Sequence, residues 1–372
     1  MLELAILGDR DTELGNQVFC VCSKKKGGVI ANRWVESQPM VDFEFKAYRR
    51  SFADSYSTAT DSWPKRAGIL IRLRDKDGQT GFGEIAPIES FGSESLVSAL
   101  AVCSQLEGEI EYEKVSNQFI DYPCVRFGLE AALAMIGRDP LWPEFSERIE
   151  VSGLLPDIGD RERIEKLIGD GYSCLKIKLG KQDFTLERRA LEEVVELTEG
   201  SIRLRLDANG GFNLNLTRTW LESLEGLPVE FFEQPMSKGE ELTMLKLGND
   251  YPTTIALDES VVRVDDLKRW KDEHWPGLLV VKPSLAGSYA SLVDELKTGD
   301  PSSLVFSSSL ETKIGTSHAL SIALESGPQK RALGFGVGGL FADEGISIDL
   351  GPCLDSNGFP ELEELEELWN QI

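Results

Sequence analysis

The feature that most constrains the fold is a series of charged residues that recur at a nearly constant interval in the second half of the chain. Lys178, Asp207, Glu233, Asp258 and Lys282 follow one another at separations of 29, 26, 25 and 24 residues. Each of them ends a short apolar segment, and an amphipathic stretch separates it from the next. This interval is the length of one strand–helix unit of a parallel sheet. The chain after residue 150 is therefore predicted to repeat that unit.

A closed barrel accounts for this pattern better than an open sheet does. In an open doubly wound sheet the reactive residues gather at one crevice, whereas here each strand ends in polar side chains. We therefore predict an α/β fold with a (β/α)7β barrel of the TIM type. The five charged residues should lie at one level around its carboxyl-terminal mouth. Grouping charged side chains at one depth is unfavourable unless they act together in one site.

Side-chain alternation along the strands supports the same arrangement. If the charged residue of a strand points into the barrel, its sequence neighbours point outward. On four strands these outward positions are apolar: Leu175, Ile177, Leu179, Ile202, Leu204, Leu206, Ile255, Leu257, Leu279 and Val281. On the fourth strand, which ends at Glu233, an inward Glu233 leaves Glu230 beside Phe232 on the helix side. Arg203 and Arg205 should point inward, with Arg205 beneath the site in an ion pair with a carboxylate.

The composition excludes several classes of protein. The chain has 372 residues and a formal net charge of −24, so it lacks the clustered basic residues that a nucleic-acid partner requires. No apolar run approaches the roughly 18 residues that span a membrane, and the start of the chain lacks the order of a signal peptide. We expect a cytoplasmic protein that acts on a small molecule, and the sequence carries no signal for an oligomeric state.

Histidine and cysteine usage limits the metals that the chain can bind. Two histidines and six scattered cysteines without a C-x-x-C pair argue against a zinc site or a disulfide framework. A metal site should therefore use carboxylates and hold a hard cation. Asp207, Glu233 and Asp258 suit one octahedral Mg²⁺, with Mn²⁺ as a substitute and open positions for substrate oxygens. A flanking lysine could then remove the proton next to a carboxylate held on that cation.

The spacing of apolar residues divides the chain into four predicted segments. Residues 1–41 show no clear period and are interpreted as an N-terminal extension. Residues 42–148 read first as strands, with a hairpin turn at Asp77-Gly78, and then as helices, which predicts an α+β unit. Residues 149–344 form the predicted barrel. Residues 345–372 form a C-terminal segment whose helix should bury Leu362, Leu365 and Trp369.

Five segments at these positions resemble the muconate-lactonising subgroup of the enolase superfamily. They are KIK (176–178), LDANGGF (206–212), FFEQP (231–235), ALDES (256–260) and VVKP (280–283). The resemblance covers about residues 42–350. It implies that the three acids bind Mg²⁺ and that lysines on two strands flank the substrate. It also implies that the α+β unit caps the barrel, contributes contacts from 51–63 and 86–95, and is completed by the C-terminal segment.

Within this subgroup, two further stretches resemble the o-succinylbenzoate synthase family. They are GEIAPIESFGSES (83–95) and SSSLETKIGTSHAL (307–320). The resemblance implies a hydro-lyase that converts 2-succinyl-6-hydroxy-2,4-cyclohexadiene-1-carboxylate to 2-succinylbenzoate by syn dehydration through an enediolate, in menaquinone or phylloquinone biosynthesis. Lys178 would take the proton and return it to the departing hydroxyl. Lys282 would stabilise the enediolate, and Lys176 would add positive charge.

An isomerase on the same scaffold is the alternative. An N-acylamino acid racemase, or another isomerase of the subgroup, would use Lys178 and Lys282 as bases on opposite faces of the substrate. Such racemases tend to carry GGMLES where this chain has SSSLET (307–312), and dipeptide epimerases carry an Asp-x-Asp that residues 334–341 lack. A non-catalytic barrel would be expected to have lost a metal ligand, and none is missing.

The remaining candidates each have a functional and a structural interpretation. Three small residues either bind the second carboxylate of the substrate or simply shape the barrel mouth: Ser307, Ser309 and Gly336. Asn209 either orients a ligand or forms the turn after its strand. Glu259 points to the face opposite Asp258 and either supports Lys282 or forms a plain ion pair. His318 is expected to be a packed residue rather than a catalytic one.

Overall fold

The computed structural model describes residues 40–106, 108–111, 118–343 and 345–372. The predicted N-terminal extension, residues 1–41, lies outside this range except for Met40 and Val41. Within the described ranges, helices are all too short or too polar to cross a lipid bilayer. The domain boundaries drawn from the sequence stay predictions.

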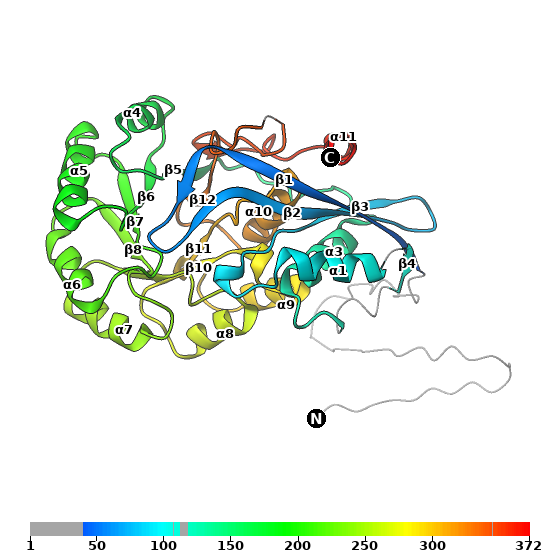
Figure 1. The fold of residues 1–372 in the computed structure, drawn as a ribbon, viewed down its shortest axis with the longest axis horizontal. Coiled ribbons are helices and arrows are strands. Elements are labelled where there is room, and N and C mark those ends of the chain that lie inside the picture. The colour runs from blue at the N-terminus through cyan, green and yellow to red at the C-terminus, as the bar shows by residue number, and fades with distance from the viewer. Residues whose placement is uncertain (1–39, 107, 112–117, 344) are drawn as a thin grey trace, which may run out of the picture. The chain divides into compact units, whose positions relative to one another are not determined.

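The first described elements form a small antiparallel sheet with two helices. Its strands are β1 (Val41–Ser57), β2 (Ser62–Arg74), β3 (Thr80–Ile85) and β4 (Gly108–Ile110), in the order β3-β2-β1-β4. The hairpin between β2 and β3 turns at Asp77 and Gly78, as predicted. Helices α1 (Leu96–Leu106) and α3 (Pro123–Met135) share an apolar core with this sheet. We call this sheet the cap sheet. In Figure 1 it lies beside the barrel strands and extends away from them.

Residues 149–336, all of which the structure describes, contain eight parallel strands alternating with seven helices. The strands are β5 (Ile149–Leu155), β6 (Cys174–Lys178), β7 (Arg203–Asp207), β8 (Val229–Glu233), β9 (Ile255–Leu257), β10 (Leu278–Val281), β11 (Leu304–Phe306) and β12 (Leu333–Gly336). The helices are α4 (Arg161–Gly169), α5 (Phe184–Leu197), α6 (Leu214–Ser223), α7 (Glu241–Asp250), α8 (Val264–Asp272), α9 (Tyr289–Leu296) and α10 (Lys313–Glu325).

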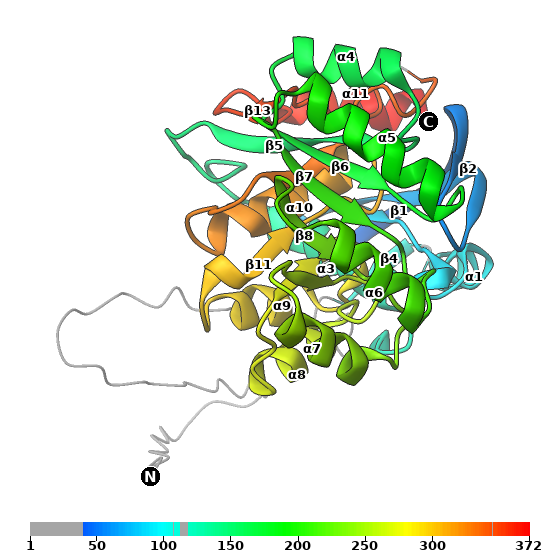
Figure 2. The ribbon, with the colours of Figure 1, turned by 90° about the vertical axis from the view of Figure 1, so that its left-hand side faces the viewer.

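The order of these strands closes a ring. Strands β5 to β11 are neighbours in the order of the sequence, and β12 pairs in parallel with β5. A bridge between Ser307 and Gly334 joins the end of β11 to β12. Figure 2 shows helices α4 to α7 outside the strands that they connect. The predicted (β/α)7β barrel is therefore confirmed.

The alternation of inward and outward side chains along the barrel strands agrees with the prediction, with one exception. All ten apolar residues predicted to face outward lie in the core between strands and helices. A separate cluster fills the barrel interior: Phe231, Ala256, Leu278, Val280 and Val305. The prediction for Glu230 is wrong. Strand β8 skips this residue in its pairing with β7, and the irregularity turns Glu230 toward Arg205 instead of the helix layer.

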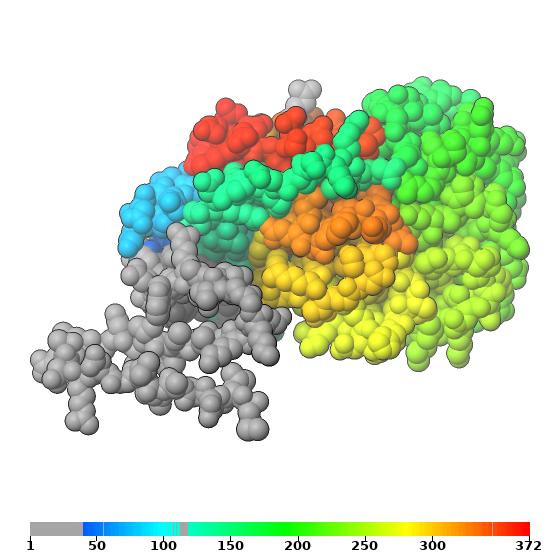
Figure 3. Space-filling view, turned by 180° about the vertical axis from the view of Figure 1, so that it is seen from behind, coloured from blue at the N-terminus to red at the C-terminus, as the bar shows by residue number. Residues whose placement is uncertain are grey.

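The C-terminal segment contacts both the barrel and the cap. Strand β13 (Cys353–Leu354) pairs with β5, and helix α11 (Leu362–Gln371) packs on cap residues that include Tyr48 and Phe82. Figure 3 shows this red segment beside the teal chain that follows α3. The buried stripe of α11 consists of Leu365, Leu368 and Trp369. Leu362, predicted to be buried, is 38% exposed, and Leu368 takes its place.

A buried carboxylate fastens the cap to the barrel. Glu84, on β3, accepts hydrogen bonds from the backbone N–H groups of Thr312 and Gly315, at the start of α10. The hydroxyl of Tyr48 donates to the same carboxylate at 2.6 Å. An acid suits this position because unpaired N–H groups and the helix dipole favour negative charge there. The contact fixes the loop that precedes α10 at the barrel mouth.

His318, on α10, supplies a test of this packing through the pH dependence of stability. Its Nε2 lies 2.7 Å from the carbonyl oxygen of Phe82, and its Nδ1 has no hydrogen-bond partner among the described residues. Burial lowers the pKa of His318 to about 4. Between the unfolded pKa near 6.5 and this value, only the unfolded chain binds the proton. Stability is therefore lost as the pH falls through this window.

We expect this histidine to cost about 2.5 kcal/mol of unfolding free energy between pH 7 and pH 4.5. Urea unfolding of the wild-type chain and of His318→Gln at both pH values measures the effect. The variant should lose less stability on acidification, by about that amount. An identical pH dependence of the two proteins would contradict the assigned burial of a neutral imidazole.

Candidate active site

Three carboxylates meet at the carboxyl ends of neighbouring barrel strands. Asp207 ends β7, Glu233 ends β8 and Asp258 follows β9. Each offers an oxygen atom, and these atoms all lie within 4.8 Å of one another. All three side chains are buried. The equal spacing in sequence thus becomes a cluster in space, because every strand delivers its last residue to the same level.

Three lysines contact this acidic triad. Lys176 Nζ lies 2.9 Å from Asp207 Oδ2 and 2.5 Å from Glu233 Oε1. Lys178 Nζ lies 2.6 Å from Asp207 Oδ2. Lys282 follows β10, four strands from the β6 strand of the other two lysines, and pairs with Asp258. The triad therefore lies between two lysines from β6 and one that follows β10.

The charges in this cluster shift the pKa of each acid. Burial alone would raise the pKa of Asp207, but Lys176 and Lys178 hold it well below its usual range. Burial raises the pKa of Glu233, and the negative charge of Asp207 adds to the rise. Burial also raises the pKa of Asp258, against the opposing charge of Lys282. For two of the three acids, burial thus opposes the charged form more strongly than the nearby lysines favour it.

These residues fit a hard divalent cation. Mg²⁺ prefers carboxylate oxygens, binds through few protein ligands and leaves positions for water or substrate. The triad offers oxygen donors only, converging within 4.8 Å, in a site where added positive charge would relieve the repulsion between buried acids. The donor set therefore matches the Mg²⁺ site expected from the sequence.

Asn209 connects Lys178 to Glu259. Its Oδ1 accepts a hydrogen bond from Lys178 Nζ at 3.0 Å, and its Nδ2 donates to Glu259 Oε1 at 3.0 Å. Asn209 also has a φ of 45°, so it forms the turn after β7 as well as contacting the lysine. The expectation that Glu259 points to the face opposite Asp258 is wrong, because this side chain lines the pocket and accepts a hydrogen bond from Asn209.

Arg205 lies below the triad, where the sequence placed it. Its Nε donates to Glu230 Oε2 at 2.7 Å, and the guanidinium is almost completely buried. Arg203 pairs with Glu150 of β5 across the barrel floor. The carboxylate partner of Arg205 is therefore not a member of the triad. It comes from the irregular position in β8.

The three small residues expected at the mouth all line the same pocket as the lysines. Ser309 Oγ is buried and has no hydrogen-bond partner within the described part of the chain, whereas Ser307 Oγ donates to the Gly334 carbonyl at 3.4 Å. A Cβ on Gly336 would lie 2.1 Å from the Ser152 carbonyl oxygen of β5. Strand packing therefore requires glycine at this position, independently of any contact between its backbone N–H and a substrate.

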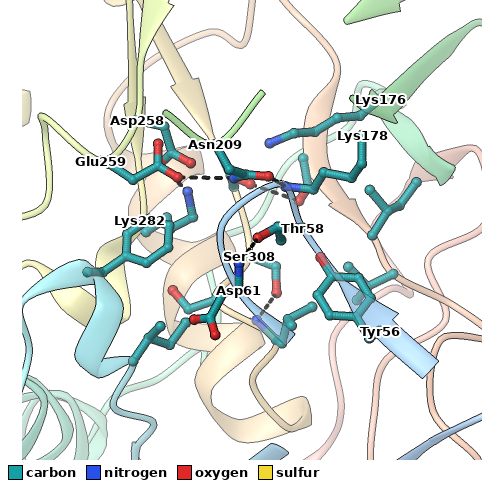
Figure 4. Close-up of a pocket in the computed structure, with 18 of the residues that line it drawn as sticks. Tyr56, Thr58, Asp61, Lys176, Lys178, Asn209, Asp258, Glu259, Lys282 and Ser308 are labelled. Atoms are coloured by element: carbon teal, nitrogen blue, oxygen red, sulfur yellow. Dashed lines mark hydrogen bonds and ion pairs between the residues drawn. The ribbon is translucent and has the colours of Figure 1, made fainter. Parts of the chain in front are cut away.

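The cap supplies a wall of the pocket from two stretches of the chain. Its residues come from the tip of the β1–β2 hairpin and from the loop after β3: Tyr56, Thr58, Thr60, Asp61, Trp63, Ile88, Ser90 and Phe91. They fall within the stretches expected from the resemblance. The Phe91 ring lies 4.8 Å from Lys282 Nζ, and Thr60 Oγ1 donates to the Asn209 carbonyl. Figure 4 shows cap and barrel side chains facing one another across the pocket.

Two known domain families match the chain. Residues 160–294 match the family described as "Enolase C-terminal domain-like". Residues 53–136 match "MenC, N-terminal domain". The first covers most of the barrel and all five charged strand ends, and the second covers most of the cap.

Curated relatives agree with these matches. An o-succinylbenzoate synthase from Thermosynechococcus vestitus is 34% identical over 304 residues, which cover 79% of this chain and 92% of the relative. One from Desulfotalea psychrophila is 31% identical and covers 67% of this chain and 69% of the relative. A hydrophobic dipeptide epimerase from a Flavobacteria bacterium is 30% identical but covers only 51% of this chain and 60% of its own length.

Solved structures share the fold. The o-succinylbenzoate synthase of Thermosynechococcus elongatus, described as complexed with Mg in the active site, superposes with a TM-score of 0.75 and 31% identity. The match covers 89% of this chain and all of the other. An N-succinyl Arg/Lys racemase from Bacillus cereus has a TM-score of 0.74 at 18% identity, over 89% of this chain and 98% of its own, which shows the fold alone.

Proposed function

This chain belongs to the o-succinylbenzoate synthases of the enolase superfamily, and from this premise we propose how its own residues carry out the reaction. The substrate is 2-succinyl-6-hydroxy-2,4-cyclohexadiene-1-carboxylate, and the products are 2-succinylbenzoate and water. The reaction belongs to menaquinone or phylloquinone biosynthesis. The observation that carries the proposal is the buried triad with Lys178 on one side and Lys282 on the other.

Asp207, Glu233 and Asp258 would hold the metal of this reaction. When bound there, Mg²⁺ supplies the positive charge that stabilises the carboxylate of the substrate as it gains electron density. An acidic protein can thus accept a dianionic substrate, because three lysines and a divalent cation together carry more charge than the three acids of the triad.

Lys178 is the proposed base and acid. It takes the proton from the ring carbon that bears the carboxylate, and the electron pair of that bond remains in the enediolate. The same lysine then protonates the departing hydroxyl, so the ring C–O bond breaks, water leaves and the ring becomes aromatic. One side chain can do both because proton and hydroxyl leave from the same face in a syn elimination.

Lys282 and Lys176 stabilise charge in this scheme without taking a proton. Lys282 lies across the pocket from Lys178, held between Asp258 and the Phe91 ring. Lys176 bridges Asp207 and Glu233 below the substrate. Preorganised positive groups of this kind act in a water-poor site where their effect is strong.

The second carboxylate of the substrate would be held by Ser307, Ser309 and the backbone N–H of Gly336. The support is the hydroxyl of Ser309 in the pocket wall, which has no hydrogen-bond partner among the described residues, and the position of all three residues opposite the β7–β9 triad. We also propose a cytoplasmic location, which the free thiols of Cys103, Cys124, Cys174 and Cys353 support.

Racemisation of N-acylamino acids is the second candidate function, because lysines contact the triad from both sides. Replacing Lys282 with alanine separates the two functions. A two-base racemase should lose solvent exchange of the α-proton for one enantiomer only. A one-base dehydratase should lose rate without any such asymmetry.

The purified chain should convert the cyclohexadiene substrate to an aromatic product when Mg²⁺ is present. Ultraviolet absorbance follows the reaction. Removal of divalent cations with EDTA should abolish turnover, and excess Mg²⁺ or Mn²⁺ should restore it. Turnover that persists in EDTA, at the rate seen with Mg²⁺, would overturn the proposed role of the triad.

A further inference from the structure

The end of strand β1 presents one aromatic side chain to the pocket. The rings of Phe52 and Tyr56 stack at a centroid distance of 5.0 Å, and Trp63 lies 5.6 Å from Tyr56 on the next strand. Phe52 in turn stacks on Phe341 of the loop after β12 at 4.8 Å. Tyr56 is only 5% exposed. Its ring is therefore held in one orientation by packing on both the cap and the barrel.

Tyr56 lies on the same side of the pocket as Lys178. It shares an apolar cluster with Leu154 of β5, and β5 is the strand that pairs with β6, which carries Lys178. Tyr56 and Lys178 both line the same pocket. Figure 4 shows the Tyr56 oxygen on the edge of the ring that faces this lysine.

The hydroxyl of Tyr56 is free to contact a substrate. It makes no hydrogen bond within the part of the chain that the structure describes, although the ring is buried. Lys178, by contrast, already donates to Asp207 and Asn209. The Tyr56 hydroxyl therefore lies at the wall of the pocket, where an oxygen atom of a bound substrate can accept its hydrogen bond.

We propose that Tyr56 is a catalytic residue that donates a hydrogen bond to the oxygen of the departing hydroxyl. This inference rests on the proposed dehydration. In a syn elimination the hydroxyl leaves on the face where the base stands, so its oxygen lies on the Lys178 side of the ring. The proton that completes water comes from Lys178, and Tyr56 keeps its own proton throughout. Its hydrogen bond stabilises the negative charge that grows on the oxygen as the C–O bond breaks.

The replacement Tyr56→Phe tests this role because it removes one oxygen and keeps the stacked ring. The reaction is run in D₂O with full-length protein and Mg²⁺, and NMR measures both product formation and deuterium in recovered substrate. We expect kcat to fall by about 10- to 100-fold. The ratio of deuterium exchange to product formation should rise, because proton removal continues while loss of the hydroxyl slows.

Phe52→Leu is the matched control, since it disturbs the same aromatic cluster without changing the hydroxyl. It should leave the ratio of exchange to product unchanged. A Tyr56→Phe protein with wild-type kcat, or with a lowered kcat and the wild-type ratio, would overturn the inference. Failure of the wild-type chain to form aromatic product would instead overturn the proposed function, so the two failures are distinguishable.

Discussion

Replacing Lys178 with alanine is expected to lower kcat for dehydration by about 10³- to 10⁴-fold. Lys178 is the one group proposed to move a proton in both halves of the reaction, so its loss removes base and acid together. Its Nζ lies 2.6 Å from Asp207 Oδ2, at the edge of the triad. Asn209 and Asp207 hold the amine of Lys178 in place. Initial rates of aromatic product formation at saturating substrate and Mg²⁺ measure the effect.

The control for this replacement is Lys181→Ala. Lys181 lies three residues further on, in the loop after β6, and lines a different cavity. Its removal takes away the same charge from the same region, so kcat should stay within about twofold of wild type. A Lys178→Ala protein that retained a tenth of the wild-type kcat would contradict the assignment of the base.

Replacing Glu233 with glutamine is expected to weaken Mg²⁺ binding by at least about 100-fold. Substitutions of residues that only support a metal ligand already cost 10- to 100-fold in affinity, and Glu233 is itself a proposed ligand. Its carboxylate lies at the centre of the triad, between the other two strand ends. Isothermal titration with Mg²⁺ in the absence of substrate measures the change directly.

A thermal measurement gives an independent view of the same site. Excess Mg²⁺ should raise the melting temperature of the wild-type chain, since a ligand that binds only the folded state stabilises it by mass action. The Glu233→Gln protein should show no such rise. The control Glu225→Gln, an exposed acid in the turn after α6, should respond like wild type. An equal Mg²⁺ response in all three proteins would place the metal elsewhere.

Much of the barrel could be predicted from the sequence because its geometry is repetitive. Each strand ends at the same level, so one interval of 24 to 29 residues places Lys178, Asp207, Glu233, Asp258 and Lys282 together. The period of two along a strand then separates inward from outward side chains. The structure confirms this for the ten apolar residues that face the helices.

The errors fall where this regular geometry stops. Strand β8 skips Glu230 in its pairing, and one skipped residue reverses the face that alternation assigns. Strand β9 ends at Leu257, so Asp258 and Glu259 already lie in a loop. Alternation no longer applies there, and Glu259 turns toward Asn209.

The cap wall could not be predicted residue by residue, because it is built from segments far from the barrel in sequence. Tyr56 and Lys178 are separated by more than a hundred residues, and only the docking of the β1–β2 hairpin brings them to one pocket. A Cβ added to Gly211 would lie 2.7 Å from the Ala59 Cβ at the hairpin tip. Local sequence carries no signal of such a close approach between two distant segments.

The central claim is that this site dehydrates a cyclohexadiene carboxylate by proton removal at Lys178. A single preparation of the full chain with Mg²⁺ tests it most directly when it is assayed for two reactions, formation of 2-succinylbenzoate and racemisation of N-succinylamino acids. We predict that kcat/KM for dehydration exceeds kcat/KM for racemisation. Rapid racemisation without any aromatic product would contradict the account.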